Sequence, residues 1–244
     1  MLTVVMPAHN EEEYLRRSVD LVVDGLRGQG EPFEVLVMEN GSTDSTAGVA
    51  LALASTHPEV VALILGPADY GAALRSGLLE ASGEWVVIFD VDLVDLCFLS
   101  RARALAEHEG AAIVVGSKRA PGSDDRRHLG RKVITAVFSV LLRVGFGLAV
   151  SDTHGLKLLR RAAVAPLVER SRFGGDIFDT ELIVRAERAG LPVAEIPVTI
   201  NDQRPPRTSI IRRIPRSLLG LARLRVALWR SAVAPVEGQD STRP

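Results

Sequence analysis

The first half of the chain alternates short, continuously apolar segments with segments of helical character, and this order restricts the fold more than any other feature. The apolar segments, each of strand length, are Leu2–Met6, Phe33–Met38, Val60–Leu65 and Trp85–Phe89. Strands that are apolar along their whole length belong to sheets covered on both faces. Between them, a helical stripe of apolar residues covers Glu12–Leu26, and further helices are expected up to Ala54 and over Tyr70–Ala81. The order predicts an α/β fold with a doubly wound, mostly parallel central sheet and helices on both faces.

The second half of the chain is less regular. We expect helices over Leu96–His108, Lys132–Val144, Ile177–Ala189 and Ile210–Trp229, and strands over Ala111–Ser117 and Val193–Ile200. There is no internal repeat or linker, and 244 residues are enough for one large core. We therefore predict one domain over residues 1–208, a basic amphipathic helical tail over 209–234, and a disordered end over 235–244.

The charge of the chain is unevenly distributed. The formal net charge is −1, which gives no reason to expect a nucleic-acid partner. Between Gln203 and Val236, however, there are eight arginines and no acidic residue. A basic tail on an acidic body indicates an anionic partner for the tail, although a helix face exposed to solvent has the same pattern.

The cysteine content and the apolar segments indicate where the protein works. Cys97 is the only cysteine, which excludes an intramolecular disulfide and suits a reducing compartment. Its apolar neighbours predict a buried thiol. The N-terminus lacks the basic segment of a secretory signal, and the longest apolar stretch, Val133–Leu142, has about half the length of a membrane span. We expect a cytoplasmic protein that is peripherally associated with a membrane.

Polar residues follow three of the predicted strands. They are Pro7–Glu11 after the first strand, Glu39–Asp44 after the second and Asp90–Asp92 after the fourth. Ligands of doubly wound sheets bind beyond the carboxyl ends of the strands, so these loops form the candidate site. Asp90 and Asp92 can point to the same side, and hard oxygen ligands suit Mg²⁺ or Mn²⁺. An Asp-x-Asp pair also occurs in surface loops and helix caps, but its place after a buried strand favours a metal site.

Two other nucleotide-binding patterns are absent from the sequence. No Gly-x-Gly-x-x-Gly follows the first strand, which argues against a dinucleotide-binding oxidoreductase. No Gly-x-x-x-x-Gly-Lys-Ser/Thr occurs either, which argues against a P-loop enzyme.

Four segments, in this order, resemble the signatures of family-2 glycosyltransferases of the GT-A fold. They are Val5–Glu12, Glu39–Thr46, Tyr70–Gly77 and Phe89–Leu93. Later segments resemble the dolichyl-phosphate mannose synthase branch of polyprenyl-phosphate glycosyltransferases, namely Val115–Lys118, Asp152–Lys157, Asp179–Leu182 and Glu195–Val198. The resemblance implies a Rossmann-like GT-A domain that uses a nucleotide-sugar.

The resemblance also implies roles for individual residues. The nucleotide-sugar pocket is implied to contain Pro7, Asn10, Glu11, Glu39, Asp90, Asp92, Arg204 and Arg207. Within it, Asp90 and Asp92 are implied to hold Mg²⁺ or Mn²⁺ on the diphosphate of the donor. The residues implied in catalysis are Asp92, Asp152 and Arg204, and those implied near the acceptor phosphate are Lys118 and Arg131.

The chain departs from the family pattern in three places. Glu39 and Asn40 stand where two aspartates are usual, which leaves the preferred nucleobase open. Val94 stands where the synthases commonly have a glutamine ligand, so Asp95, water and the donor are the candidates to complete the metal shell. In the late loop, Arg207 takes the place of a charge that a lysine usually supplies.

The resemblance implies an inverting transfer by direct displacement. The sugar implied is mannose from GDP-mannose, with a UDP-sugar as the other donor, and the acceptor implied is a polyprenyl or dolichyl phosphate. A phosphate monoester is mostly dianionic at neutral pH and needs no general base, and no His–carboxylate base stands out in the sequence. Two alternatives stay open: a GT-A enzyme with a soluble or other lipid acceptor, and a catalytically silent nucleotide-binding scaffold associated with a membrane.

Two predicted helices have the character of membrane-surface segments. Lys132–Val144 is apolar with basic residues at its ends, and Ile210–Trp229 mixes large apolar residues with arginines. Basic amphipathic helices can lie in the interface of anionic membranes, where a polyprenyl phosphate would also be found. The same periodicity is typical of helices that pack on a sheet or on a second subunit.

Overall fold

The computed structural model describes residues 1–125, 129–175, 177–200 and 210–233. The chain divides into two units, Met1–Pro205 and Pro206–Pro244. The described part of the first unit contains two sheets and their helices, and that of the second contains one helix. The boundaries expected at residues 208 and 234 stay predictions, and residues 235–244 lie outside the described part.

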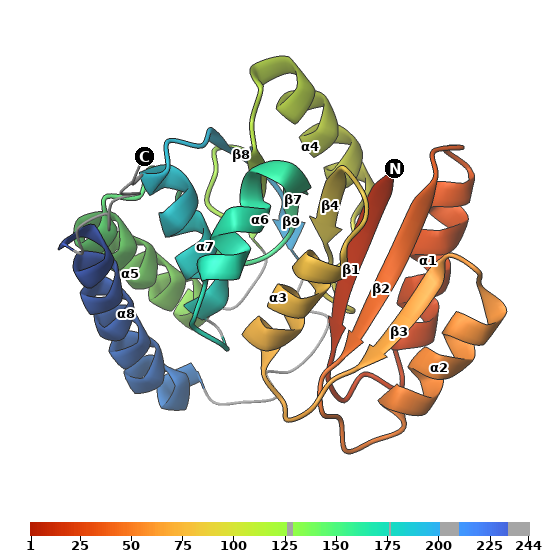
Figure 1. Ribbon diagram of the computed structural model, residues 1–244. Helices are drawn as coiled ribbons and strands as arrows, with labels where there is room; N and C mark the ends of the chain where they lie inside the picture. Colours follow the sequence, from red (N-terminus) through yellow and green to blue (C-terminus); the bar gives the residue numbers. More distant parts are fainter. Residues whose placement is uncertain (126–128, 176, 201–209, 234–244) are drawn as a thin grey trace, which may run out of the picture. The chain divides into compact units, whose positions relative to one another are not determined.

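The larger sheet of the first unit has the strand order β3-β2-β1-β4-β7-β5-β8 (Figure 1). Its strands are β1 (Leu2–Ala8), β2 (Phe33–Glu39), β3 (Val60–Ile64), β4 (Trp85–Ile88), β5 (Ile113–Ser117), β7 (Lys157–Arg160) and β8 (Val193–Pro197). Neighbouring strands run parallel except at β7, which is antiparallel to both β4 and β5. A separate pair joins β6 (Asp124–Asp125) to β9 (Thr199–Ile200). The predicted mostly parallel α/β sheet is confirmed.

Helices cover both faces of this sheet, as its continuously apolar strands predict. On one face, a single hydrophobic core joins the strands to α1 (Leu15–Arg27), α2 (Thr46–Thr56) and α4 (Leu96–Glu109). On the other face lie α3 (Tyr70–Glu80), α6 (Arg161–Arg170) and α7 (Ile177–Arg188), which contact one another (Figure 1). The remaining helix of this unit is α5 (Leu129–Phe146).

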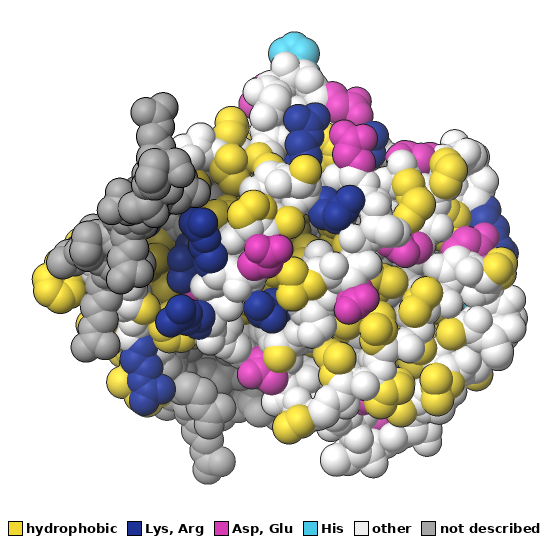
Figure 2. Space-filling model, in the orientation of Figure 1, with side chains coloured by type: hydrophobic (Ala, Val, Ile, Leu, Met, Phe, Trp, Pro, Cys, Tyr) yellow, Lys and Arg dark blue, Asp and Glu magenta, His cyan; other side chains and the backbone are white. Residues whose placement is uncertain are grey.

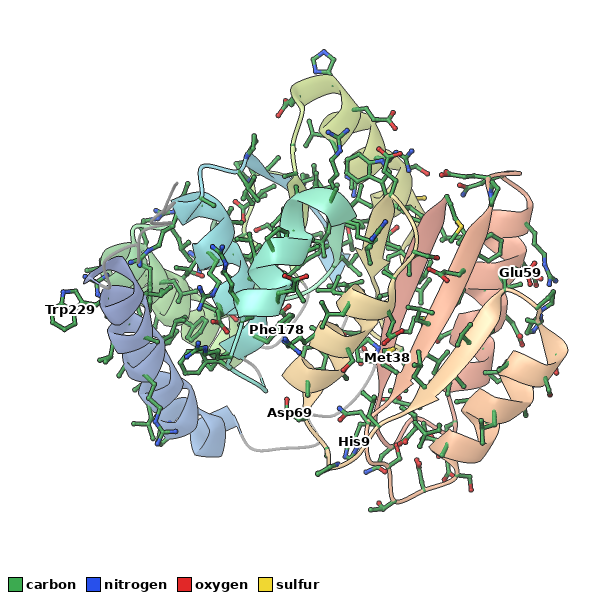
Figure 3. The ribbon with its side chains drawn as sticks, viewed as in Figure 1. His9, Met38, Glu59, Asp69, Phe178 and Trp229 are labelled. Atoms are coloured by element: carbon green, nitrogen blue, oxygen red, sulfur yellow. The ribbon has the colours of Figure 1, made fainter. Side chains whose placement is uncertain are left out.

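The side chains of the central strands divide between these two layers. Val4 and Met6 of β1 belong to the core beneath α1, α2 and α4. Val5 points to the opposite face, where it and Met38 of β2 lie against Gly77 of α3 (Figure 3). Because successive residues of a strand point to opposite faces, both layers are built from one uninterrupted apolar segment.

Three elements, β6, β7 and α6, do not follow from the sequence pattern. β6 is a pair of aspartates, and β7 has only four residues, of which Lys157 and Arg160 are basic, so neither pattern distinguishes a strand. α6 contains Pro166, which disfavours a helix interior. In addition, the strand predicted over Val193–Ile200 divides into β8 and β9.

Cys97 is exposed, so the prediction of a buried thiol is wrong. The residue lies in the first turn of α4, whose buried side is formed by Phe98, Leu99 and Ala102. An apolar local sequence cannot show which side of a helix faces the core when the helix has only a weak stripe.

The order in which the strands are added to the sheet reverses between β1 and β4, and this reversal determines where a ligand can bind. From β1 the chain proceeds outward to β2 and β3, and it then returns to β4 on the other side of β1. The connections that leave β1 and β4 therefore turn to opposite sides, which opens a crevice beyond their carboxyl ends. The loops predicted as the site all begin at this edge.

The second unit contributes α8 (Ile210–Val233), which confirms a helix in the predicted basic segment. Leu221, Leu224 and Leu228 recur on one stripe of this helix, while Arg223 and Arg225 are exposed. No helix in the described ranges is both long and apolar enough to cross a membrane.

The close approach of α3 to the start of α7 gives a stability prediction. A Cβ atom on Gly71 would lie 2.7 Å from the backbone nitrogen of Gly175 and 2.7 Å from the Cβ of Phe178, which is labelled in Figure 3. We expect Gly71→Ala to lower the free energy of unfolding by about 1–3 kcal/mol, because α3 must move away from backbone atoms. Chemical denaturation measures this difference.

Gly48 provides the matched control for this substitution. It lies in the first turn of α2, and a Cβ atom there would meet nothing within 4 Å. Gly48→Ala should leave stability unchanged or raise it by up to about 1 kcal/mol, because alanine favours the helix. An equal stability of the two variants would contradict the close packing of α3.

Candidate active site

The loops after β1 and β2 form one hydrogen-bonded unit around Asn10. Asn10 has a φ of 55°, a left-handed conformation that a non-glycine residue adopts only at a cost. Its backbone N–H donates to the Ser42 hydroxyl (2.9 Å), and its side-chain oxygen accepts the N–H of Thr43 (2.8 Å). Glu39 accepts the N–H of Ser42 at 2.6 Å. Asn10, Glu39 and the loops that carry them are thus brought together, as the sequence predicts.

The ring of His9 belongs to the same unit. Its Nδ1 lies 2.7 Å from the carbonyl oxygen of Asn40, which can only accept, so Nδ1 carries a hydrogen. Its Nε2 lies 3.2 Å from the side-chain nitrogen of Asn10 and accepts from it. His9 therefore links Asn40 to Asn10.

The side chain of Asn40 has a structural role. It is buried, and its Oδ1 accepts the backbone N–H of Asp69 at 2.6 Å. Asp69 in turn begins α3, where its Oδ1 accepts the N–H groups of Ala72 (2.9 Å) and Gly175 (2.7 Å). His9 and Asp69 accordingly lie at the same end of the sheet (Figure 3).

The remaining residues predicted around the nucleotide, Pro7 and Glu11, lie at the end of β1 and in the loop that follows it. Pro7 is buried near the end of β1, where it is paired in register with Met38. The N–H of Glu11 donates to the Thr46 hydroxyl at 2.7 Å. Asp44 accepts the N–H of Thr46 at 2.9 Å, which identifies it as a helix-capping residue.

Asp90 and Asp92 follow β4 in a tight turn, in which the N–H of Leu93 donates to the carbonyl oxygen of Asp90 at 2.9 Å. The carboxylate of Asp90 is half-buried and accepts the Tyr70 hydroxyl at 3.0 Å, whereas Asp92 is exposed. Burial raises the pKa of Asp90, and the charges of Asp92 and Asp179 add to this rise, while Tyr70 and Lys157 oppose it.

These two carboxylates fit a hard divalent cation. Their mutual repulsion is relieved by a cation between them, and oxygen is the ligand that Mg²⁺ and Mn²⁺ prefer. Among the described residues, no three His, Cys, Asp or Glu side chains form a cluster that could hold a metal ion. Asp95, expected as a substitute ligand, caps α4 by accepting the N–H of Phe98 at 2.8 Å. Water and donor phosphates would therefore have to complete the shell.

A second acidic group, Asp152, lies beside Lys118 after β5. The Lys118 ammonium is 3.6 Å from the carboxylate of Asp152, which is 6% exposed. The N–H of Asp152 donates to Glu195 (3.0 Å), and its Oδ1 accepts the N–H of His154 (3.0 Å). Burial opposes ionisation of Asp152, but Lys118, His154 and Lys157 outweigh it, and the pKa of Asp152 lies below its ordinary value.

The structure adds a buried ion pair for which the sequence predicts no role. The Lys157 ammonium in β7 lies 3.0 Å from Oδ1 of Asp179 in α7, and the two side chains are 0% and 1% exposed. A lysine in an apolar run, and an aspartate within a helix that is buried on every side, are the signals that could have found it. Glu181, two residues further along α7, is also buried, and it is paired with Arg185 at 2.7 Å.

Three predicted residues cannot be placed. Arg204 and Arg207 lie within residues 201–209, outside the described part of the chain, and Arg131 belongs to α5 but its side chain is not described. Their implied contacts with phosphate stay predictions.

Comparison with solved structures shows the same fold. Glucosyl-3-phosphoglycerate synthase from Mycobacterium tuberculosis, in complex with Mg²⁺ and UDP, superposes with a TM-score of 0.67 at 23% identity, over 93% of this chain and 79% of that one. Its complex with Mn²⁺, UDP and glucosyl-3-phosphoglycerate gives a TM-score of 0.64, with 23% identity, over 98% of this chain and 82% of that one. At this identity the likeness shows the GT-A fold alone.

Sequence relatives extend over most of the chain. Dolichyl-phosphate β-glucosyltransferase ALG5A of Trichomonas vaginalis is 29% identical over 82% of this chain, and the match spans 66% of that protein. ALG5D of the same organism is 28% identical over 95% of this chain and 73% of its own length. A Mycobacterium bovis protein described as "Uncharacterized glycosyltransferase Mb0553" is 32% identical over 94% of this chain and 96% of its own.

The family model for glycosyl transferase family 2 matches residues 3–167, which include the loops after β1, β2 and β4 and both aspartates of the Asp-x-Asp turn. The resemblance found in the four sequence segments is thereby confirmed. The chain belongs to glycosyl transferase family 2.

Proposed function

We propose that the protein is an inverting glycosyltransferase that moves a hexose from a nucleotide-sugar to a polyprenyl phosphate at a membrane surface. The observation that carries the proposal is the turn after β4, which presents half-buried Asp90 and exposed Asp92 beside the polar loops of β1 and β2. This edge of a doubly wound sheet is where a nucleotide would bind. The polar groups of Asn10 and Glu39 are already held in fixed positions there.

Relatives suggest the sugar. Both Trichomonas vaginalis relatives are dolichyl-phosphate β-glucosyltransferases, and they support glucose as the sugar and dolichyl or another polyprenyl phosphate as the acceptor. UDP-glucose is therefore the first donor of the proposal. GDP-mannose, implied by the resemblance to mannose synthases, is the second.

In the proposed reaction Asp90 and Asp92 hold Mg²⁺ or Mn²⁺. The ion would neutralise the charge that develops on the departing nucleoside diphosphate. Tyr70 orients the carboxylate of Asp90 through its hydroxyl hydrogen. Arg204 and Arg207, if they close over the diphosphate as the resemblance implies, would add donors that strengthen as this charge grows.

On the acceptor side, Lys118 and Arg131 would bind the phosphate. Lys118 is positioned by Asp152, which the lowered pKa keeps ionised at neutral pH. A dianionic phosphate oxygen can attack the sugar without losing a proton, so Asp152 need not act as a base. Its carboxylate instead restricts where the Lys118 ammonium can lie.

The apolar stripe of α5 supports a lipid acceptor and a peripheral membrane location. Val137, Val140, Leu141 and Val144 are all exposed and recur at helical spacing, and Val144 is 81% exposed. Arg143 beside them is exposed as well. Elsewhere, Figure 2 shows hydrophobic side chains scattered singly among polar ones over α2, α3 and β3, which is usual for a protein surface. A continuous stripe with basic residues suits an anionic membrane interface.

The stripe is also connected to the proposed acceptor site. Phe138, on the same helix, packs edge-to-face on His154, with ring centroids 5.7 Å apart. His154 is held next to Asp152 by the hydrogen bond described above. A phosphate whose prenyl chain lies along α5 would therefore be near Asp152 and Lys118. A cytoplasmic, peripheral location is part of this proposal.

The first test of the proposal is transfer of labelled sugar into lipid. With Mn²⁺, UDP-[¹⁴C]glucose and dolichyl phosphate, we expect label to enter the organic phase, and Asp92→Asn to lower the rate by roughly a hundredfold or more. Asp24→Asn, a matched change at an exposed position of α1, should leave the rate unaltered. If label entered the organic phase from GDP-mannose and not from UDP-glucose, the transferred sugar would be mannose. If the protein bound nucleotide but transferred sugar to no acceptor, the alternative of a catalytically silent nucleotide-binding scaffold would be favoured.

The second test concerns the hydroxyl of Tyr70. Tyr70→Phe keeps the ring but removes the hydrogen bond to Asp90, and we expect Mn²⁺ affinity, measured by calorimetric titration, to fall roughly tenfold. Tyr14→Phe makes the same change at the start of α1 and should not alter the affinity. Loss of affinity in both variants, or in neither, would count against the proposed role of Tyr70.

The third test concerns the membrane face. In liposome flotation with anionic lipids, replacing Val137, Val140 and Val144 together with serine should reduce the bound fraction severalfold, because about 1.5–3 kcal/mol of apolar transfer is lost for each fully buried valine. A matched triple change at exposed Leu51, Val61 and Ile64 should not reduce it. Undiminished binding of the α5 variant would show that the α5 stripe does not bind the membrane. Truncation of the chain before Ile210 tests membrane binding by the basic tail separately.

A further inference from the structure

Lys157 occupies an unusual position for a charged side chain. It is in register with Ile88 of β4 on one side and Val115 of β5 on the other, so it lies in the interior of the sheet, just before the turn that carries Asp90. Its side chain is completely buried. The ammonium donates to the carbonyl oxygen of Gly155 at 3.0 Å and lies 3.0 Å from Oδ1 of Asp179. A buried charge of this kind persists only where other charges compensate it.

The carboxylates around Lys157 are incompletely satisfied. Neither oxygen of Asp179 receives a hydrogen bond in the described structure, so the contact with Lys157 is its principal compensation. Oδ2 of Asp152 is likewise buried without a hydrogen-bond partner, and the nearest recorded cation is Lys118 at 3.6 Å. Asp179 and Oδ2 of Asp152 therefore depend on ammonium groups, whereas Oδ1 of Asp152 accepts the N–H of His154.

These groups form one electrostatic cluster with the Asp-x-Asp turn. Lys157 is paired in register with Ile88, two residues before Asp90, and Asp179 contacts its ammonium from α7 at 3.0 Å. Lys118 and Lys157 also act together on Asp152. The members of the cluster are the carboxylates of Asp90, Asp92, Asp152 and Asp179 and the ammonium groups of Lys118 and Lys157.

We infer that Lys157 is a positioning residue that sets the charge balance of the metal site. Its buried ammonium holds Asp179 in place and lowers the net negative charge around the Asp-x-Asp turn, so that the anionic phosphates of the donor can approach. Lys157 acts through the carboxylates and does not touch the substrate. The inference rests on the proposed function, because it takes Asp90 and Asp92 as the metal-binding pair.

This role has a consequence that separates it from a purely structural one. Removing the positive charge of Lys157 makes the cluster more negative, which should strengthen binding of a divalent cation and weaken binding of a diphosphate. If Lys157 only supported the fold, its loss would disturb the turn after β4 and weaken both. The sign of the change in metal affinity therefore decides between the two roles.

The test measures Mn²⁺ binding to the full chain without nucleotide, by calorimetry. Lys157→Met should bind Mn²⁺ more tightly by roughly fivefold or more, because it removes a nearby positive charge whose repulsion of a dication persists even when screened as in water. Asp179→Asn should bind it more weakly. Lys132→Met, the same change on α5, should leave the affinity as in the wild type. At saturating Mn²⁺, the KM for the nucleotide-sugar should rise in Lys157→Met.

A double variant keeps the test decisive if Lys157→Met does not fold. Lys157→Met combined with Asp179→Asn removes both buried charges, a change that proteins often tolerate. It should bind Mn²⁺ more tightly than Asp179→Asn alone and about as tightly as the wild type. Unchanged or weaker binding on loss of Lys157, in either background, would overturn the inference. Failure of the wild type itself to bind Mn²⁺ would overturn the metal site of the proposed function and this inference together.

Discussion

The pairing of β1 with β2 along one edge and with β4 along the other is the constraint on which the site depends. In register, Val5 of β1 lies between Leu36 of β2 and Ile88 of β4, so the three strands end at one edge of the sheet. The loops that follow them contain Asn10, the Glu39–Asn40 pair and the Asp-x-Asp turn. A slip in register by one residue would move each side chain of a strand to the opposite face, disrupt its packing and move these loops apart.

The antiparallel strand β7 adds a buried positive charge, that of Lys157, beside these loops. By entering the sheet between β4 and β5, it places a lysine at the interior of the sheet beside the start of the Asp-x-Asp turn. Asp179 of α7 meets this lysine from the helical layer. A buried ion pair is weak evidence for stability, since desolvation offsets much of its attraction. Its position next to the Asp90–Asp92 turn favours a role in the electrostatics of the site.

The two sides of the proposed site differ in character. On the proposed nucleotide side, Asn10, Glu39 and Asn40 are fixed by short hydrogen bonds within and between loops. Lys118 and Asp152 are linked by a looser contact of 3.6 Å, and the nearby α5 exposes an apolar stripe. A nucleotide-sugar arriving from water and a polyprenyl phosphate arriving from a membrane would meet between two such surfaces.

The sequence by itself determined the α/β class, the helices on both faces, the three polar loops and the Asp90–Asp92 pair. These features depend on local periodicity and on position after a strand, which a single chain displays directly. The tertiary structure alone decided that Lys157 pairs with Asp179, that Tyr70 donates to Asp90 and that Asn40 anchors α3. Each of these contacts joins segments that are far apart in the chain, and the strand that carries Lys157 is too short for its pattern to be recognised. The direction of β7 follows from which neighbours it can bond, and this is a property of the assembled sheet rather than of its four residues.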